Sequence, residues 1–333
     1  MKEINRRDYI LKLIIEEFIR TAEPVGSQYL LDEFNLSYST ATIRAEMQKL
    51  EEDGFLEKTH TSSGRVPSSK GYRYYIENLR EEALDNEFKG ALTTLFDNRS
   101  QNLDDVIAKS CEMLSELTKY TTLVLGPNSD MITLEKIQLI SLPSSNVLIL
   151  CTSTGHVESL NFNLTENVDP KDLEVCLDIL SERLKGTNIN ELSEKAYLLK
   201  PLLSERIKTH EIIFNAFLDA FKRFSAEKMS VYGRENILDQ KEFTADITKL
   251  KKIVNLLNSD EVWRKLSNRE GLIVKIGSEM LVIELDDASV VSSTIEIGNE
   301  TRTIALIGPK RMDYDKAIEA MKYIQNKLNE KKG

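Results

Sequence analysis

The sequence predicts an α+β protein of several domains, and three observations support this class. Residues 1–80 have mostly helical patterns, strand patterns follow one another from residue 121, and a mostly helical block separates these from a second group that begins at residue 272. A sheet that stops, gives way to helices and then resumes is typical of one domain inserted into another. With 333 residues, 41% hydrophobic and 29% charged, the chain is long enough for several buried cores.

The composition argues against several kinds of site and location. Cys111, Cys151 and Cys176 are far apart, form no C-x-x-C pair and lie in apolar patterns, so we expect buried free thiols. The histidines are equally scattered, so neither a zinc site nor a Cys/His nucleophile pair is indicated, and we expect no cofactor. No stretch approaches a run of about 18 apolar residues, and the N-terminus lacks the apolar region of a signal peptide. We therefore expect a cytoplasmic protein with no membrane partner.

Two helices are predicted first. Apolar positions between Tyr9 and Ile19 recur at helical spacing and indicate an amphipathic helix that ends near Pro24. Ser27 is a suitable N-cap for a short second helix through Glu33. A tight turn follows this helix.

A third helix is predicted from about Ser39 to Gly54, because its apolar residues share one face. Two short helices joined by a few residues are typical of a helix–turn–helix, whose second helix enters the major groove of DNA by its N-terminal end. Small hydroxyl side chains and an arginine suit that end, because they reach phosphates and guanine edges. The residues assigned to the major groove are Ser39, Thr40, Thr42, Arg44 and Gln48. Any small helical bundle shows the same apolar spacing, so the helices alone leave both alternatives open.

The segment after this helix predicts a strand–loop–strand wing with Gly64 in its polar loop. Between Lys58 and Ile76 the chain has no Asp or Glu, although its formal net charge is −10. A wing along the minor groove needs a flexible glycine, cations and no acids, since each Lys or Arg at a phosphate releases counterions. A phosphate-binding nucleotide loop is the rival interpretation, but Ser69 and Gly71 stand where that motif needs glycine and a hydroxyl residue.

The basic residues of this stretch complete the predicted DNA-binding surface. We assign Arg65 to the minor groove or its phosphates, and Lys70 and Arg73 to the DNA backbone. Tyr72 is counted with them, with packing on its own domain as the alternative.

The remaining chain is divided by its change of pattern. Residues 81–102 are predicted as a connector, residues 103–188 and 267–333 as two parts of one sheet domain, and residues 189–266 as a mostly helical insertion. The predicted strands span residues 121–125, 134–142, 147–152, 157–163, 272–276, 281–284, 290–297 and 301–307. A last helix is predicted over residues 314–328.

An aromatic face in the predicted insertion has two interpretations. Phe217, Phe221 and Phe224 recur at helical spacing and either fill the core of their own domain or form a subunit interface. We assign them to a homodimer interface, because one winged helix contacts only a few base pairs, whereas two related by a two-fold axis read an inverted repeat.

Two motifs resemble the HrcA family, bacterial repressors of heat-shock chaperone genes. The run STATIRAEMQKLEEDGFLEKTHTSSGRVPSSKGYRYYIENL is similar to the winged-helix end of that family, and IALIGPKRMDYDKAI at residues 304–318 is similar to its C-terminal signature. The resemblance implies a GAF-like α/β sheet domain and an inserted dimerisation domain. It also implies an inverted-repeat operator upstream of chaperone operons as the double-stranded DNA partner, and assistance from the chaperonin GroEL.

These observations favour a dimeric, sequence-specific repressor. One alternative is a winged-helix regulator released by a small ligand in its GAF-like domain. An enzyme with an accessory DNA-binding domain is another, but no run has a nucleophile, a base and oxyanion donors at motif spacing, so we expect no enzymatic activity. Lys310 and Arg311 flank the start of the last helix and form either an anion site or a structural turn that Asp313 caps.

Overall fold

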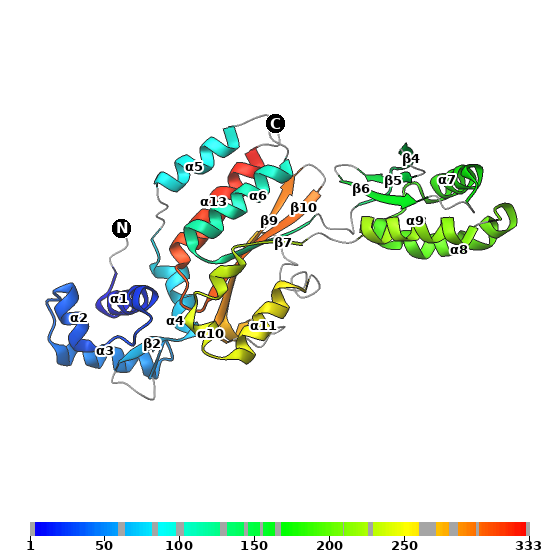
Figure 1. Ribbon diagram of the computed structural model, residues 1–333. Coiled ribbons are helices and arrows are strands. Elements are labelled where there is room, and N and C mark those ends of the chain that lie inside the picture. The colour runs from blue at the N-terminus through cyan, green and yellow to red at the C-terminus, as the bar shows by residue number, and fades with distance from the viewer. Residues whose placement is uncertain are drawn as a thin grey trace.

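The chain folds as an α+β protein in which three parts follow one another across the molecule (Figure 1). This computed structural model describes residues 4–58, 64–81, 86–97, 103–126, 132–142, 146–153, 156–163, 168–208, 210–225, 229–259, 271–279, 286–297 and 300–330. A mostly helical N-terminal unit lies at one end, a five-stranded sheet covered by helices lies in the middle, and a separate lobe lies at the other end.

The N-terminal unit comprises residues 4–58 and 64–81. Its elements are α1 (Arg6–Thr21), α2 (Ser27–Phe34), α3 (Thr40–Glu52), β1 (Leu56–Lys58), β2 (Arg65–Pro67), α4 (Ser69–Tyr74) and the π-helix η1 (Tyr75–Leu79). The order agrees with the sequence prediction, except that the N-cap of α2 is Gly26 and not the predicted Ser27, which is the first residue of the helix. Strands β1 and β2 pair antiparallel. Of the loop predicted over residues 59–65, residues 59–63 lie outside the described residues, and Arg65 is the first residue of β2.

The central sheet has the strand order β7-β3-β10-β9-β8, and every neighbouring pair is antiparallel. The strands are β3 (Thr121–Leu125), β7 (Met229–Tyr232), β8 (Leu272–Ile276), β9 (Ala288–Ile297) and β10 (Glu300–Pro309). Side chains of β10 alternate between two cores, because successive residues of a strand point to opposite faces. The strand predicted over residues 281–284 lies outside the described residues.

Helices cover both faces of this sheet (Figure 1). One face packs against α6 (Leu103–Thr118) and α13 (Tyr314–Glu330), and the other against α10 (Lys241–Thr244) and α11 (Ile247–Leu257). Part of the predicted connector is the helix α5 (Asn86–Asp97), whose Leu92 is fully buried in the same core as α13. The connector is therefore partly a packed helix.

The lobe is an α+β unit between β3 and β7 in the chain. Its antiparallel sheet consists of β4 (Lys136–Leu142), β5 (Asn146–Ser153) and β6 (His156–Asn163), and its helices are α7 (Pro170–Leu184), α8 (Leu192–Arg206) and α9 (His210–Ser225). The inserted unit does not have the predicted borders, residues 189–266. Strands β4–β6 form their own sheet, whereas β7, α10 and α11 belong to the central sheet and its cover. Local strand patterns do not specify which sheet a strand joins, so the sequence placed the border too late.

The aromatic face of α9 lies inside the lobe. Phe217, Phe221 and Phe224 are between 0% and 1% exposed and belong to one core with residues of β5, α7 and α8. Their assignment to a dimer interface was therefore wrong, and the alternative, burial within their own domain, holds. With Phe214, which is 1% exposed, they are the buried aromatic residues of this core in the described part of the lobe.

The three cysteines are buried free thiols, as the sequence predicted. Burial raises the pKa of Cys151 and the pKa of Cys176, each to about 12. The charge of Glu158 adds to the effect at Cys151. Neither thiol is therefore ionised near neutral pH. In the part of the chain that the structure describes, no helix combines the length and apolar character needed to cross a membrane.

The burial of Phe221 predicts a specific loss of stability. We expect Phe221→Ala to lower the free energy of unfolding by about 3–5 kcal/mol, because it leaves a cavity in the core of the lobe. Urea denaturation measures this change. The matched control Val175→Ala, at a 39% exposed helical position of the same lobe, is expected to shift it by less than about 0.5 kcal/mol. Equal effects of both variants would contradict the packing described here.

Candidate nucleic-acid interface

Helix α3 presents a continuous stripe of exposed residues, which are polar except for two alanines. Its exposed residues recur at helical spacing and are Ala41, Arg44, Ala45, Gln48, Lys49 and Glu52. The opposite side, with Ile43, Met47 and Leu50, is buried in the core of the N-terminal unit. The apolar spacing that fixes this helix on its neighbours thus also fixes which side chains point outward.

The hydroxyl groups at the start of α3 hold the helix in place. Ser39 Oγ accepts a hydrogen bond from the Thr42 backbone N–H at 3.2 Å and lies 2.9 Å from Thr42 Oγ1. Thr40 Oγ1 donates to Gln28 Oε1 at 3.2 Å and so joins the start of α3 to α2. These three predicted site residues therefore lie at the N-terminal end of α3 and orient the helix.

Arg44 and Gln48 lie one turn apart on the exposed stripe. The Arg44 side chain forms no hydrogen bond or ion pair with any residue that the structure describes, so its guanidinium is available to a partner. The Gln48 amide donates to Glu52 Oε1 at 2.9 Å, a bond that pre-orients the side chain along the helix. This pair has the chemistry that reads guanine and adenine edges in the major groove.

Lys49 is an exposed cation that the sequence assignment missed. It lies on the same stripe, four residues after Ala45, and its Nζ is 3.9 Å from Glu46 Oε2. Helical phase counted from Arg44 and Ala45 would have identified it. Its position at the edge of the stripe suits a contact with a phosphate.

Arg65 is held by an acid from α3. Its Nε donates to Glu51 Oε2 at 2.7 Å, and only 16% of its side chain is exposed. Its backbone also pairs with Val25 in both directions at 2.9 Å, which ties the start of β2 to the segment between α1 and α2. The sequence predicted a cation without acidic neighbours, but Glu51 precedes the acid-free stretch between Lys58 and Ile76.

Lys70 caps the end of α3. Its Nζ donates to the Asp53 carbonyl oxygen at 2.7 Å and lies 4.6 Å from the centre of the Phe55 ring. A cation at this end of a helix is favourable, because the carbonyl groups there concentrate negative partial charge. Lys70 remains exposed, so the ammonium retains an open side toward solvent.

Tyr72 and Arg73 face the central sheet. Tyr72 is 1% exposed and its ring lies 5.5 Å from that of Tyr314, so its assignment to a DNA-binding surface was wrong. Arg73 Nη2 donates to the Val274 carbonyl oxygen at 2.7 Å, and its guanidinium pairs with Glu279. The sequence did not show that the central sheet lies on this side of α4, so both side chains were assigned to the DNA-binding surface.

The start of α13 is a structural turn. Asp313 Oδ1 accepts a hydrogen bond from the Lys316 backbone N–H at 2.9 Å, and the Arg311 guanidinium pairs with Glu242. Arg311 also donates to the Ile19 carbonyl oxygen of α1 at 3.3 Å. Of the two interpretations of this segment, the structural one holds for Arg311, whose charge is already matched.

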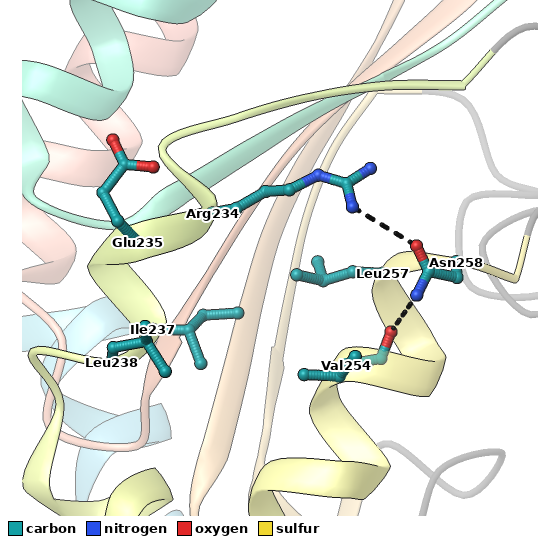
Figure 2. Close-up of a pocket in the computed structure, with 7 residues that line it drawn as sticks. All are labelled: Arg234, Glu235, Ile237, Leu238, Val254, Leu257 and Asn258. Atoms are coloured by element: carbon teal, nitrogen blue, oxygen red, sulfur yellow. Dashed lines mark hydrogen bonds between the residues drawn. The ribbon is translucent and has the colours of Figure 1, made fainter.

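A small apolar pocket lies between the 3₁₀ turn η4 (Arg234–Ile237) and α11 (Figure 2). Its volume is about 310 Å³, and it is lined by Arg234, Glu235, Ile237, Leu238, Val254, Leu257 and Asn258. Arg234 extends across the pocket toward Asn258, with 3.4 Å between Nη1 and Oδ1 (Figure 2). This size suits a small apolar group, and the pocket lies on the opposite side of the sheet from α13.

The matching family model and the relatives identified by sequence agree on one family. A family model described as HrcA protein C terminal domain matches residues 104–318. The Heat-inducible transcription repressor HrcA of Oceanobacillus iheyensis is 40% identical over 331 residues, covering 97% of this chain and 95% of the relative. The protein of that name in Halalkalibacterium halodurans is 36% identical over 330 residues, covering 97% and 96%. A crystal structure titled as that of a hypothetical protein at 2.2 Å resolution has a TM-score of 0.70 at 23% identity and covers 98% of both chains, a likeness of fold alone.

The hydroxyl groups of Tyr72 and Tyr75 are expected to contribute differently to stability. The Tyr72 hydroxyl is buried and has no hydrogen-bond partner among the described residues, whereas the Tyr75 hydroxyl donates to Asp315 Oδ2 at 2.7 Å. We expect Tyr72→Phe to leave the free energy of unfolding unchanged or to raise it by up to about 1 kcal/mol, and Tyr75→Phe to lower it by about 1–3 kcal/mol. Thermal unfolding of both variants measures the difference. A larger loss from Tyr72→Phe than from Tyr75→Phe would contradict these contacts.

Proposed function

Because the chain belongs to the HrcA family, we propose that it is a heat-inducible transcription repressor that binds an inverted-repeat DNA operator as a homodimer. In this proposal residues 1–80 form a winged helix-turn-helix and α3 is its recognition helix. The observation that carries the proposal is the exposed stripe of α3 with the unpaired Arg44.

The stripe supports docking of α3 in the major groove. Arg44 would make a bidentate contact with guanine O6 and N7, and Gln48 would contact adenine. Ala41 and Ala45 stand beside Arg44 on the stripe. Small side chains at these positions allow the helix to approach the base edges closely, and their methyl groups suit contact with thymine.

The wing has a smaller part in this proposal than its charge suggested. Arg65 reaches a phosphate only when its bond to Glu51 is exchanged, and Lys70 would contact a phosphate while it caps α3. Base readout by α3 therefore contributes more to specificity than the wing does, and the wing positions the domain on the backbone.

Dimerisation is proposed to use the outer surface of the lobe, because Phe217, Phe221 and Phe224 are in its core. Tyr197 and Leu198 of α8 and Ile212 of α9 are exposed apolar residues of the lobe, with Leu198 76% exposed. A packed pair of helices with large apolar groups at the surface is a suitable subunit contact.

Assistance by the chaperonin GroEL is proposed from the family resemblance. Such assistance requires a repressor whose DNA-competent form is only marginally populated without help, which suits a multidomain chain with a discontinuous sheet domain. The second candidate function, release from DNA by a small ligand, is favoured by the apolar pocket between η4 and α11.

Binding titrations on two kinds of DNA test the proposal. We expect the purified protein to prefer an inverted repeat over scrambled DNA by about 1000-fold or more, and Arg44→Ala to reduce this preference as well as the affinity, because it removes a base contact. Titration at several salt concentrations, with and without chaperonin, measures both quantities. An equal loss on the repeat and on scrambled DNA for Arg44→Ala would show that Arg44 contacts only the backbone.

The ion pair between Glu51 and Arg65 predicts a gain of function. We expect Glu51→Gln to raise the affinity for all DNA and to steepen the dependence of log K on log salt by about 0.9, because Arg65 no longer has to exchange a charged partner for a phosphate. The control is the same substitution in an Arg65→Ala background, in which the slope is expected to stay constant. A similar steepening in both backgrounds would mean that Glu51 acts through its charge alone.

A further inference from the structure

We infer that Arg73 and Glu279 are positioning residues that fix the N-terminal unit on the central sheet and so set the half-site spacing that a dimer accepts. The inference rests on the proposed DNA-binding function, but the contact between Arg73 and the central sheet can be tested without DNA. It assigns Arg73 an intramolecular role in place of the phosphate contact that the sequence predicted.

The N-terminal unit shares a core with the central sheet domain. Tyr72, Tyr75 and Tyr314 are each between 0% and 1% exposed where α4 and η1 meet α13. One continuous apolar cluster joins residues of α1 and α3 to residues of α13. A unit attached in this way does not move as a module on a flexible linker.

Arg73 is bound to the sheet through both ends of its guanidinium. Nη2 donates to the Val274 carbonyl oxygen of β8 at 2.7 Å, and Nε donates to Glu279 Oε1 at 3.1 Å. Glu279 Oε2 in turn accepts a hydrogen bond from the Ile276 backbone N–H at 3.0 Å. The acid is therefore fixed by the end of β8, and the planar guanidinium is fixed in both distance and direction.

Other contacts restrain the unit around the tyrosine cluster. Arg80 Nη1 pairs with Glu319 Oε1 at 2.8 Å, with side chains 12% and 16% exposed, and the Tyr75 hydroxyl donates to Asp315. Burial, followed by the charge of Asp315, raises the pKa of Tyr75, so this phenol stays protonated and keeps donating. These contacts lie along α13, whereas Arg73 lies toward β8, so Arg73 supplies the restraint on a second side.

The direction of α3 is consequently set by the central sheet. In a dimer formed elsewhere on the chain, two recognition helices lie at one distance and one angle, and they fit half-sites whose separation is near a multiple of about 34–36 Å on one duplex face. Loosening one restraint widens the range of separations that the two helices accept. It leaves the base contacts of each helix unchanged.

The experiment is a titration of the full chain on inverted repeats whose spacers differ by single base pairs, beside a single half-site and scrambled DNA. We expect the native chain to prefer one spacer over its neighbours by about tenfold or more, because realigning half-sites costs deformation energy. In Arg73→Ala and in Glu279→Gln this preference is expected to fall to about threefold or less, with half-site sequence preference unchanged. The control Glu77→Gln removes the same charge at an exposed position of η1 and is expected to keep the native preference.

A second measurement examines the docking itself. Spin labels on Ser37→Cys and Glu116→Cys, both at exposed positions, report the distance between the N-terminal unit and α6, and the native thiols are buried. We expect a narrow distance distribution that broadens in Arg73→Ala and in Glu279→Gln.

Each result decides between the two roles of Arg73. An unchanged spacer preference and an unchanged distance distribution in both variants would overturn the inference. A uniform loss on all DNA with a salt slope lowered by about 0.9, in Arg73→Ala but not in Glu279→Gln, would also overturn it and make Arg73 a phosphate contact. Absence of any preference for the repeat in the native chain would overturn the proposed function, while the label distances would still report on the docking.

Discussion

The packing of Tyr72 and Tyr75 against Tyr314 is the constraint on which the arrangement of the molecule depends. The chain leaves the β1–β2 ribbon at Pro67 and within a few residues places two large aromatic side chains in a core that it shares with α13. This core holds the N-terminal unit against the central sheet, and the contacts of Arg73 with Val274 and Glu279 add a second restraint on the direction of α3. A helix that only had to bind DNA would not need such an attachment.

The candidate site shows why an acid-free stretch is not a stretch of free cations. The sequence correctly located the N-terminal turn of α3 and its exposed Arg44, because helical phase is a local property. It could not show that Arg65 meets Glu51 or that Arg73 meets Glu279, since these acids come from other elements. The chain has 54 acidic and 44 basic residues, so a cation that packs against another element has many carboxylates available as partners.

The fold was predictable element by element and less so in its assembly. Nearly all predicted helices and strands that the structure describes lie within a few residues of their expected ends, because apolar periodicity encodes them locally. Membership in a sheet depends on pairing between distant residues, and β3 and β4, which follow one another in the chain, join separate sheets. The face of Phe217 and Phe221 was misplaced for the same reason, since a single chain does not show which large apolar face lies inside and which lies between subunits.

The distribution of paired and unpaired cations has a consequence for a repressor. Non-specific affinity depends on how many cations reach phosphates, whereas discrimination depends on contacts with base edges. Here Arg65 and Arg73 are matched by carboxylates, and Arg44 is not. Under the proposed function, this arrangement would lower binding to random DNA more than binding to an operator. Because a genome offers about a million or more competing sites, the ratio of the two affinities matters more to a repressor than the tightness of either.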